Sequence, residues 1–298
     1  MRILVTGKNG QLGRSIHKIV NTKIDNNQSS DEFIFVGRED LDLSSENSIS
    51  HYFGNNDKFD IIINCAAYTQ VDKAEQEVEL ANQINHLAVK QLASFASKQQ
   101  AKLIHISTDY IFDGESDKPY TETDVTNPIN VYGKTKLAGE KALQAVMLTN
   151  ALIIRASWLY SEYGNNFVST MLRLGKERDE LNVVSDQIGS PTYATDLADV
   201  ILEIIQNKSF TKTSQATQIY HYSNEGEISW YKFAQEIFKI AKIDCRVNPI
   251  TTQQYPMPAK RPINTIMNTD KVAEIFSMNT SNWKESFNTC IIKLRKKS

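Results

Sequence analysis

The chain has 298 residues and a formal net charge of −2, and 41% of its residues are hydrophobic and 23% charged. This length allows one or two domains with a large buried core, and the composition excludes a wholly disordered or fibrous chain. The near-neutral charge argues against nucleic acid as a partner, and no apolar run approaches the ~20 residues that a membrane span needs.

The first half of the chain alternates short apolar runs with longer amphipathic stretches. We predict strands at 2–6, 33–36, 59–64, 102–107 and 151–155, helices at 11–20, 72–98 and 131–147, and a polar surface loop at 21–32. Continuous apolar strands separated by helices are typical of βαβ units, which build a parallel sheet with helices on both faces. Residues 1–157 are therefore predicted to form an α/β domain of the Rossmann type, with a doubly wound parallel sheet.

The second half has shorter and more mixed segments. We predict helices at 166–176, 193–206 and 229–241, strands at 181–185 and 219–222, and a loop with three prolines at 252–262. Residues 158–298 are predicted to form a smaller domain that mainly binds the substrate, while parts of 186–224 return to the sheet. A short basic run near the C-terminus, at 293–297, is predicted to be a solvated tail.

The first predicted strand runs into the glycine-rich segment TGKNGQLG, residues 6–13. Glycines at this place allow a tight turn between strand and helix, and they let a pyrophosphate approach the backbone N–H groups at the positive end of the helix. The strand before and the helix after favour dinucleotide binding over a glycine-rich turn without a ligand. The expected contacts come from Gly7, Asn9, Gly10, Gln11, Leu12 and Gly13.

Gly37 and Arg38 follow the second predicted strand, where many dinucleotide-binding folds carry an acid for the ribose 2′-hydroxyl. An arginine without that acid suits the 2′-phosphate of NADP better. NADPH is therefore the expected cofactor, with NADH as the alternative, although Arg38 alone could be a solvated loop residue.

Tyr132 and Lys136 are four residues apart in a predicted helix, which puts the phenol and the ammonium on one face. A nearby cation lowers the pKa of a tyrosine from ~10, and such a phenol can protonate a carbonyl oxygen that receives a hydride. Thr108 follows the fourth predicted strand, at the edge of the sheet where open α/β folds bind ligands. Each feature is weak alone, since Thr108 could be a turn residue, but together they predict a reductase site.

The cysteines and histidines indicate no metal site. Cys65, Cys245 and Cys290 are odd in number and widely spaced, which favours a reducing compartment, and hence the cytoplasm, over a disulfide frame or a structural zinc ion. The five histidines lack the spacing of metal ligands as well.

Eight segments carry a resemblance to a known family. They are TGKNGQLG (6–13), NCAAYTQVDKAE (64–75), STDYIFDG (107–114), NPINVYGKTKLAGE (127–140), RASWLY (155–160), YGNNFV (163–168), DQIGSPT (186–192) and RPIN (261–264). Over nearly its whole length the chain resembles the extended short-chain dehydrogenase/reductases. Within that superfamily it is most similar to the dTDP-4-dehydrorhamnose reductase family, to which the last four segments are specific.

This resemblance implies that NADPH reduces the C4 keto group of dTDP-4-dehydro-L-rhamnose and gives dTDP-L-rhamnose for cell-surface polysaccharides. Tyr132 would donate the proton, Lys136 would lower its pKa and bind the nicotinamide ribose, and Thr108 would position the keto group. The implied further cofactor contacts are Asp42, Leu43, Ala66, Ala67 and Tyr68. The implied substrate contacts are Thr108, Asp109, Trp158, Asn166, Gln187 and Arg261.

Several alternatives stay open. Trp158 could be a core residue and Arg261 a loop cation. Ser15 stands where some members of the family carry a glutamate of a magnesium site, so no metal is expected. The chain could instead be a reductase or epimerase of another nucleotide sugar, or a regulatory subunit of the same fold that binds NADP without catalysis. A homodimer is possible.

Overall fold

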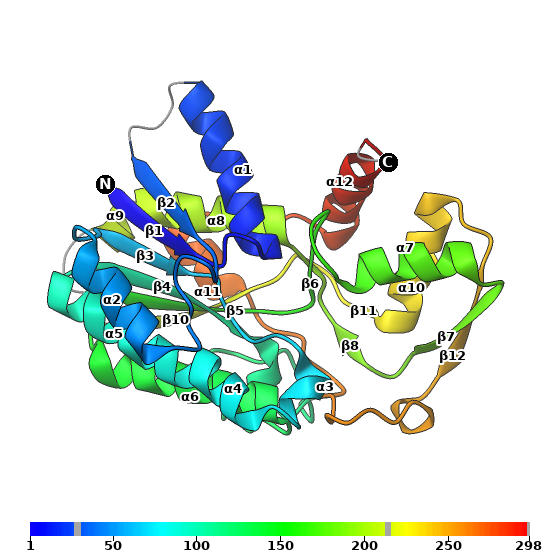
Figure 1. Cartoon of the computed structure of the whole chain (residues 1–298). Coiled ribbons are helices and arrows are strands. Elements are labelled where there is room, and N and C mark those ends of the chain that lie inside the picture. The colour runs from blue at the N-terminus through cyan, green and yellow to red at the C-terminus, as the bar shows by residue number, and fades with distance from the viewer. Residues whose placement is uncertain (27–30, 212–215, 297–298) are drawn as a thin grey trace.

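A parallel sheet of six strands forms the first of two lobes in the computed structural model, which describes residues 1–26, 31–211 and 216–296 (Figure 1). The strands lie in the order β10 (Gln218–Tyr222), β5 (Ala151–Ala156), β4 (Lys102–Thr108), β3 (Ile61–Asn64), β1 (Arg2–Thr6) and β2 (Glu32–Val36). The order of strand addition reverses between β1 and β3, which opens a crevice at the carboxyl ends of these two strands. The predicted doubly wound α/β fold is confirmed.

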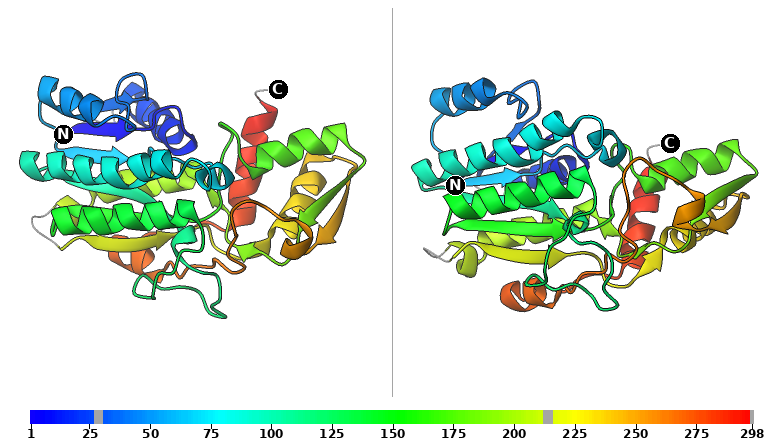
Figure 2. Two further views of the ribbon diagram at one scale, coloured as in Figure 1. Left: turned by 60° about the horizontal axis from the view of Figure 1, so that its bottom comes forward. Right: turned by 90° about the horizontal axis from the view of Figure 1, so that it is seen from below.

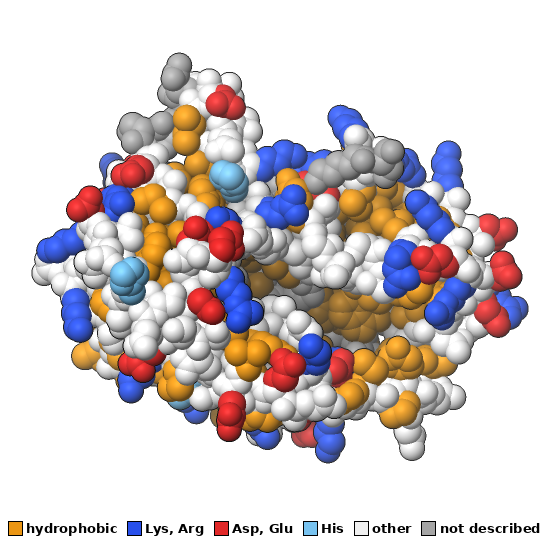
Figure 3. All heavy atoms as spheres, in the orientation of Figure 1, with side chains coloured by type: hydrophobic (Ala, Val, Ile, Leu, Met, Phe, Trp, Pro, Cys, Tyr) orange, Lys and Arg blue, Asp and Glu red, His pale blue; other side chains and the backbone are white. Residues whose placement is uncertain are grey.

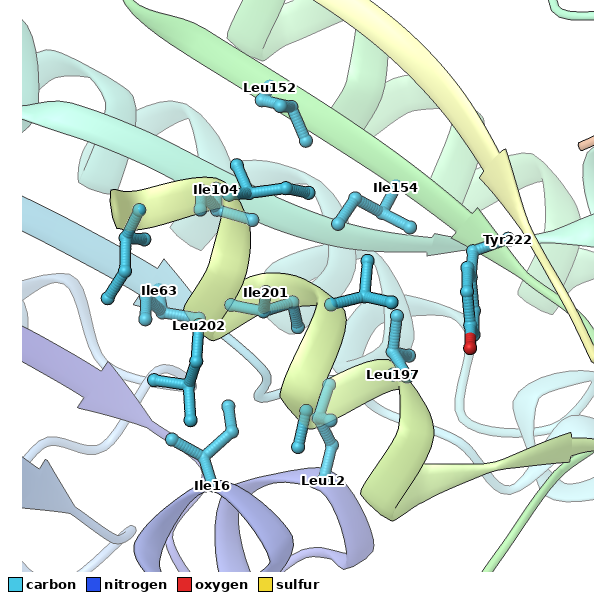
Figure 4. Close-up of a cluster of buried hydrophobic side chains, with 14 of the residues drawn as sticks. Leu12, Ile16, Ile63, Ile104, Leu152, Ile154, Leu197, Ile201, Leu202 and Tyr222 are labelled. Atoms are coloured by element: carbon cyan, nitrogen blue, oxygen red, sulfur yellow. The ribbon is translucent and has the colours of Figure 1, made fainter. Parts of the chain in front are cut away.

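Helices cover both faces of this sheet (Figure 2). On one face lie α1 (Gln11–Asp25), α8 (Ala194–Gln206) and α11 (Asp270–Phe276), and on the other α2 (Glu46–Asn55), α5 (Ala88–Gln99) and α6 (Val131–Val146). Strand residues alternate between the two cores, so Ile3 and Val5 pack with α1 and α8, whereas Leu4 packs with α2 and α5. Figure 4 shows the first of these cores, where Ile201 of α8 lies among side chains of the sheet and of α1.

The second lobe is smaller and has its own core. It contains α7 (Phe167–Glu177), α10 (Trp230–Ala241) and α12 (Trp283–Arg295), together with the parallel pair β7 (Glu180–Val184) and β12 (Arg246–Ile250). Phe233 and Phe287, both almost fully buried, stand at the centre of its aromatic cluster. Two short ladders, β6 (Leu159–Tyr160) with β9 (Thr192–Tyr193) and β8 (Ile188–Gly189) with β11 (Ile228–Ser229), complete the strands around this lobe.

Three segments after residue 157 belong to the first lobe. Helix α8 packs on α1, β10 pairs with β5 at the edge of the sheet, and α11 packs against β10. A short helix, α9 (Lys208–Thr211), follows α8. Among the helices of the described ranges, none has the length and apolarity that crossing a bilayer requires.

Several sequence predictions are wrong in their bounds. The predicted loop at 21–32 is helical up to Asp25, and its residues 27–30 lie outside the described part. The predicted helix at 72–98 is divided into α3 (Val71–Ala74), α4 (Val78–Asn82), a π-helical turn η1 (Gln83–Leu87) and α5. Residues 293–295 of the predicted tail belong to α12, where Lys293 donates to the hydroxyl of Tyr193 at 2.9 Å, and residue 297 lies outside the described part.

Candidate active site

The glycine-rich loop turns tightly between β1 and α1. Gly7 has a φ of +73°, and a Cβ there would lie 2.9 Å from the backbone nitrogen of Ala66. A Cβ on Gly13 would lie 2.2 Å from the carbonyl oxygen of Gly7, so the first turn of α1 packs directly on the loop. Gly10 is the N-cap of α1 and offers no side chain to its first N–H groups. These features fit a pyrophosphate, because bare backbone donors face outward at a positive helix end.

Three other residues predicted for this loop lie in different surroundings. Asn9 is exposed, and the side chain of Leu12 is buried in the core beneath α1. Gln11 reaches across to the second lobe, where its Oε1 accepts from Asn166 at 2.9 Å and from Ser161 at 3.0 Å. Leu12 can therefore contact a cofactor only through its backbone.

A charged cluster follows β2, and the sequence analysis missed most of it. Lys8 lies 2.6 Å from Asp40 and 2.9 Å from Glu39, and Asp40 also accepts from the backbone N–H of Gly37 at 2.9 Å. An acid therefore does stand near the end of β2, contrary to the sequence argument for NADP. The exposed side chain of Arg38 and the nitrogen of Lys8 are nevertheless two cations that suit a 2′-phosphate.

The other two residues predicted beside Arg38 serve its loop. Asp42 is 3.5 Å from the Arg38 guanidinium and accepts from the backbone and the hydroxyl of Ser44, at 2.9 and 2.7 Å. Leu43 is buried in the core under α2. These contacts hold the segment after β2 in place.

The segment after β3, with Ala66, Ala67 and Tyr68, lies beside the glycine-rich loop. Asn85 of the π-helical turn holds it, because its amide accepts from the backbone N–H of Tyr68 at 2.9 Å and donates to the carbonyl of Tyr68 at 3.1 Å. The Tyr68 hydroxyl donates to Glu77 at 2.7 Å. Sequence analysis did not single out Asn85, whose function appears only when α4 and α5 are placed against the sheet.

Thr108, Tyr132 and Lys136 meet at the carboxyl end of β4. Thr108 is the last residue of β4, and its hydroxyl donates to Asp109 at 3.0 Å. Helix α6 begins beside it, with Asn130 as N-cap accepting from the backbone of Gly133 at 2.8 Å. Lys136 is buried and donates to the carbonyl oxygen of Ile106 at 2.6 Å.

The electrostatics of the pair differ from the sequence argument. Burial raises the pKa of Tyr132 to about 12, and hydrogen bonding with Thr108 opposes this only in part. Burial lowers the pKa of Lys136 to about 8, against the nearby charge of Glu140. In this arrangement burial dominates the pKa of Tyr132 and the Lys136 ammonium donates to the carbonyl oxygen of Ile106 on β4, so a lowering of the Tyr132 pKa by Lys136 stays a prediction. The phenol is held in its protonated form, which is the form that can donate a proton.

Asp109 lies directly behind Thr108 and is 2% exposed. Burial raises the pKa of its carboxyl to about 6, although hydrogen bonding with Thr108 opposes the shift. A carboxyl in this position can accept from Thr108 and so fixes the direction of the Thr108 hydroxyl.

Trp158, a predicted substrate contact, packs against the core of the second lobe. Its ring stacks on that of Trp230, with centroids 3.4 Å apart and planes 7° apart, and its backbone adopts a left-handed φ of +43°. A Cβ on Gly189 would lie 2.6 Å from the Trp158 ring. The partly exposed Trp158 ring is thus clamped between β8 and α10, and it presents an aromatic surface of the kind that suits a sugar face.

The other predicted substrate contacts are engaged within the protein. Asn166 caps α7 and accepts from the backbone of Ser169 at 3.0 Å, and Gln187 donates to Thr252 at 3.0 Å. The Arg261 guanidinium lies 2.6 Å from Asp72 of α3 and donates to the carbonyl of Ala259 at 2.8 Å. These residues line the join between the lobes, and their part in binding a substrate stays a prediction.

Figure 3 shows a hollow between the two lobes, with apolar side chains on its floor. The loop that joins β12 to α11, which contains the turn η3 (Thr252–Gln254), crosses beneath it to α3 and α6 (Figure 1). There Asn130 donates to the carbonyl of Lys260 at 2.9 Å. The second short turn, η2 (Asp109–Ile111), carries Asp109 and Tyr110 to the same place.

All three cysteines lie in the described part and are free thiols. Burial raises the pKa of the Cys65 thiol to about 12, so this cysteine is held as an unreactive thiol. Over 1–26, 31–211 and 216–296, no three His, Cys, Asp or Glu side chains are grouped so that they could hold a metal ion.

Comparisons with known proteins extend over nearly the whole chain. A family model described as the RmlD substrate binding domain matches residues 1–296. The chain is 41% identical over 293 residues to the dTDP-4-dehydrorhamnose reductase of Aggregatibacter actinomycetemcomitans, with 96% of each chain covered.

Two solved structures are similar in both sequence and fold. The dTDP-4-dehydrorhamnose reductase of Clostridium acetobutylicum superimposes with a TM-score of 0.90 at 42% identity, covering 99% of this chain and 100% of the other. The same enzyme of Bacillus anthracis, in complex with NADP, has a TM-score of 0.89 at 37% identity, covering 98% of this chain and 99% of the other.

Proposed function

Since the chain belongs to the RmlD substrate binding domain family, we propose that it is a dTDP-4-dehydrorhamnose reductase, which reduces the C4 keto group with NADPH and forms dTDP-L-rhamnose. The observation that carries the proposal is the meeting of Thr108, Tyr132 and Lys136 beside the glycine-rich loop. A regulatory subunit without activity would not need these three groups together.

NADPH, when bound, supplies the hydride that C4 of the sugar receives. The bare N-terminus of α1 and the glycines at positions 7 and 13 are suited to its pyrophosphate. Lys8 and Arg38 are suited to the 2′-phosphate, and Ala66, Ala67 and Tyr68 to the side of the dinucleotide nearer the crevice. The NADP complex of the Bacillus anthracis relative supports this choice of cofactor.

The proton for the new hydroxyl comes from Tyr132. As hydride reaches C4, the C4–O double bond becomes a single bond, and the keto oxygen takes the phenolic proton. The Thr108 hydroxyl, which donates to Asp109 at 3.0 Å, would turn to donate to the same oxygen and hold it toward Tyr132. Lys136 would stabilise the resulting phenolate through its positive charge, and it would hold the nicotinamide ribose when NADPH is bound.

We assign cofactor binding to residues 1–157, with the returning segments of 186–224, and nucleotide-sugar binding mainly to residues 158–298. Trp158 would lie against the sugar ring, and Arg261 would pair with the diphosphate after leaving Asp72. Asp109, Asn166 and Gln187 complete the proposed substrate site. The free cysteines support a cytoplasmic location. Nucleic acid and metal ions have no part in the proposal, and a homodimer stays a prediction.

The proposal is tested by following the absorbance of NADPH with dTDP-4-keto-6-deoxyglucose, with and without a 3,5-epimerase. Oxidation only when the epimerase is present supports the function, because it places the substrate in the L-series. Oxidation without epimerase indicates another C4 reductase. Protein that binds NADPH and oxidises it with neither substrate would reject the proposal in favour of a regulatory subunit.

The roles at the site are tested by Tyr132→Phe, which removes one hydroxyl. We expect a loss of turnover of at least about 100-fold, the lower range for a general acid, with unchanged NADPH affinity. Tyr160→Phe is the matched control, because the hydroxyl of the buried Tyr160 makes no hydrogen bond to the described residues. Equal activity of the two variants would reject the role of Tyr132.

A further inference from the structure

A row of buried polar side chains crosses the sheet and ends at Lys136. Thr6, Asn64 and His105 are direct register partners on β1, β3 and β4. The Thr6 hydroxyl is 2.6 Å from Oδ1 of Asn64, Nδ2 of Asn64 is 3.0 Å from Nδ1 of His105, and Nε2 of His105 is 3.4 Å from Nζ of Lys136. All four side chains are at most 2% exposed. Nothing in the proposed reaction uses the first three.

The side chains of Thr6, Asn64 and His105 belong to the face of the sheet that α5 and α6 cover. Each stands two residues beyond an apolar residue of that core, as His105 does beyond Leu103. Buried polar groups in such a place destabilise the fold unless every donor meets an acceptor. The protons of the row can therefore be placed only so that each donor faces an acceptor.

The charge of the Lys136 nitrogen decides between two arrangements of the protons in this row. A charged ammonium can only donate, so Nε2 of His105 must accept, and the ring carries its proton on Nδ1. The Asn64 amide is then turned over, so that its carbonyl oxygen accepts a hydrogen bond from Nδ1–H of His105 and its NH₂ group donates to Thr6. A neutral amine can accept instead, so the ring carries its proton on Nε2, and Asn64 donates to Nδ1 while Thr6 donates to Asn64. His105 carries one proton in both.

We propose that His105 is a positioning residue for Lys136, and that its neutral ring changes tautomer as Lys136 gains or loses its proton, while Asn64 and Thr6 reverse with it. The amine thus stays at the end of β4 in both charge states. Its leaving proton goes to solvent, and His105 gains no charge. The effect of this tautomer change on catalysis rests on the proposed function.

The titratable groups around Lys136 are consistent with such a change. Burial holds the pKa of His105 well below its usual value, which keeps the ring neutral. Tyr132 and Glu140 lie on the same helix as Lys136, and Asp109 lies after β4. The carboxylate of Glu140 is already paired at 2.8 Å with Arg155 of β5, so Lys136 does not have a counter-ion of its own among the described residues.

His221 provides a matched control within the same chain. It is as buried as His105, with Nδ1 3.1 Å from the carbonyl oxygen of Tyr120 and Nε2 3.3 Å from the guanidinium of Arg155. An arginine stays charged at every accessible pH, so His221 must keep its proton on Nδ1. We therefore expect only His105, which faces the amine of Lys136, to change its tautomer with pH.

The experiment is a pH titration of the ring nitrogens by NMR, on the whole protein labelled with ¹⁵N-histidine. His105→Gln and Lys136→Met assign the signals. We expect the His105 tautomer to change together with the titration of Lys136, near pH 8, and to stay fixed in Lys136→Met. His221 should not change in either protein. A His105 ring that keeps one tautomer at every pH at which the protein is folded overturns the proposal.

Turnover gives an independent measurement. His105→Phe removes both ring nitrogens, and we expect it to lower kcat about tenfold or more and to shift its pH profile, with little change in the KM of the sugar. His105→Gln keeps an acceptor for Lys136 and should recover part of the loss. Equal pH profiles in wild type and His105→Phe would contradict positioning. An inactive wild-type protein whose His105 still changes tautomer would reject only the proposed function.

Discussion

Gly133 offers a direct test of how closely the catalytic helix approaches the turn η2, which follows β4. It follows Tyr132 in the first turn of α6, and a Cβ there would lie 2.1 Å from the carbonyl oxygen of Tyr110 and 3.0 Å from Pro128. The carbonyl is backbone and cannot rotate away. Gly133→Ala should therefore force α6 to move by about 1 Å, since ordinary contact begins only at 3.4 Å.

The sign of the stability change follows from two opposing effects. Alanine in a helix stabilises by about 1 kcal/mol relative to glycine, whereas overpacking of a fixed core costs about 1–3 kcal/mol. We expect Gly133→Ala to lower the free energy of unfolding by up to about 2 kcal/mol. Gly54→Ala, in α2, is the control, because a Cβ there meets no atom within 4 Å. It should stabilise by up to about 1 kcal/mol.

Gly133→Ala should lower turnover more strongly than it lowers the free energy of unfolding. A misplacement of about 1 Å at a reacting group can lower turnover about 100-fold. Urea unfolding at constant slope measures the stability of both variants, and NADPH oxidation measures turnover under conditions where both are folded. If Gly133→Ala is as stable and as active as Gly54→Ala, the close approach of α6 to Tyr110 does not exist in solution.

Two further predictions concern charged groups. The carboxyl of Asp109 has a folded pKa of about 6 against an ordinary value of 3.8, so the folded state holds its proton longer and stability falls as the pH rises from about 4 to 6. Asp109→Asn should remove this fall, so above pH 6 its free energy of unfolding should be about 3 kcal/mol higher than that of the parent. If the free energies of unfolding of the two proteins change with pH in parallel, the carboxylate of Asp109 is not buried as the structure has it. Arg261→Gln should raise the KM of the nucleotide sugar about tenfold while leaving that of NADPH unchanged, because it removes a charge-assisted pair with the diphosphate. Asp72→Asn breaks the same ion pair but keeps the guanidinium, so an equal rise of KM in both variants would show that Arg261 only fastens its loop.

The sheet could be predicted because its signal is local. Ile3, Leu4 and Val5 are fully buried, and a run of apolar residues between turns is what a strand with two covered faces requires. Helix α2 had a usable signal that was not recognised: Ser45 caps it by accepting from Ser48, and Ile49 and Phe53 are buried four residues apart. The error at 21–25 has another cause, since composition alone cannot distinguish an exposed helical turn from a loop.

Parts of the candidate site had no local signal. Asn85 interrupts what otherwise resembles one long helix, and the π-helical turn lets its amide face Tyr68. On α6, Gly139 is required there as well, because a Cβ on it would lie 2.1 Å from the carbonyl oxygen of Asn85. Both residues are defined by contacts between elements that are distant in the chain, such as α6 and the π-helical turn. A single sequence therefore cannot distinguish them from ordinary helix residues.

Tyr132 and Lys136 show that spacing alone does not determine the pKa values of a pair of groups. The interval of four residues does place both on one face of α6, but Lys136 has a nearer partner in the carbonyl oxygen of Ile106. Desolvation then acts on both groups, raising the pKa of the phenol and lowering that of the amine. A protonated phenol beside an amine that titrates near neutrality is suited to giving a proton to a new alcohol and regaining one afterwards. This property arises from the packing of α6 on β4, because the same two residues on an isolated helix would both be solvated.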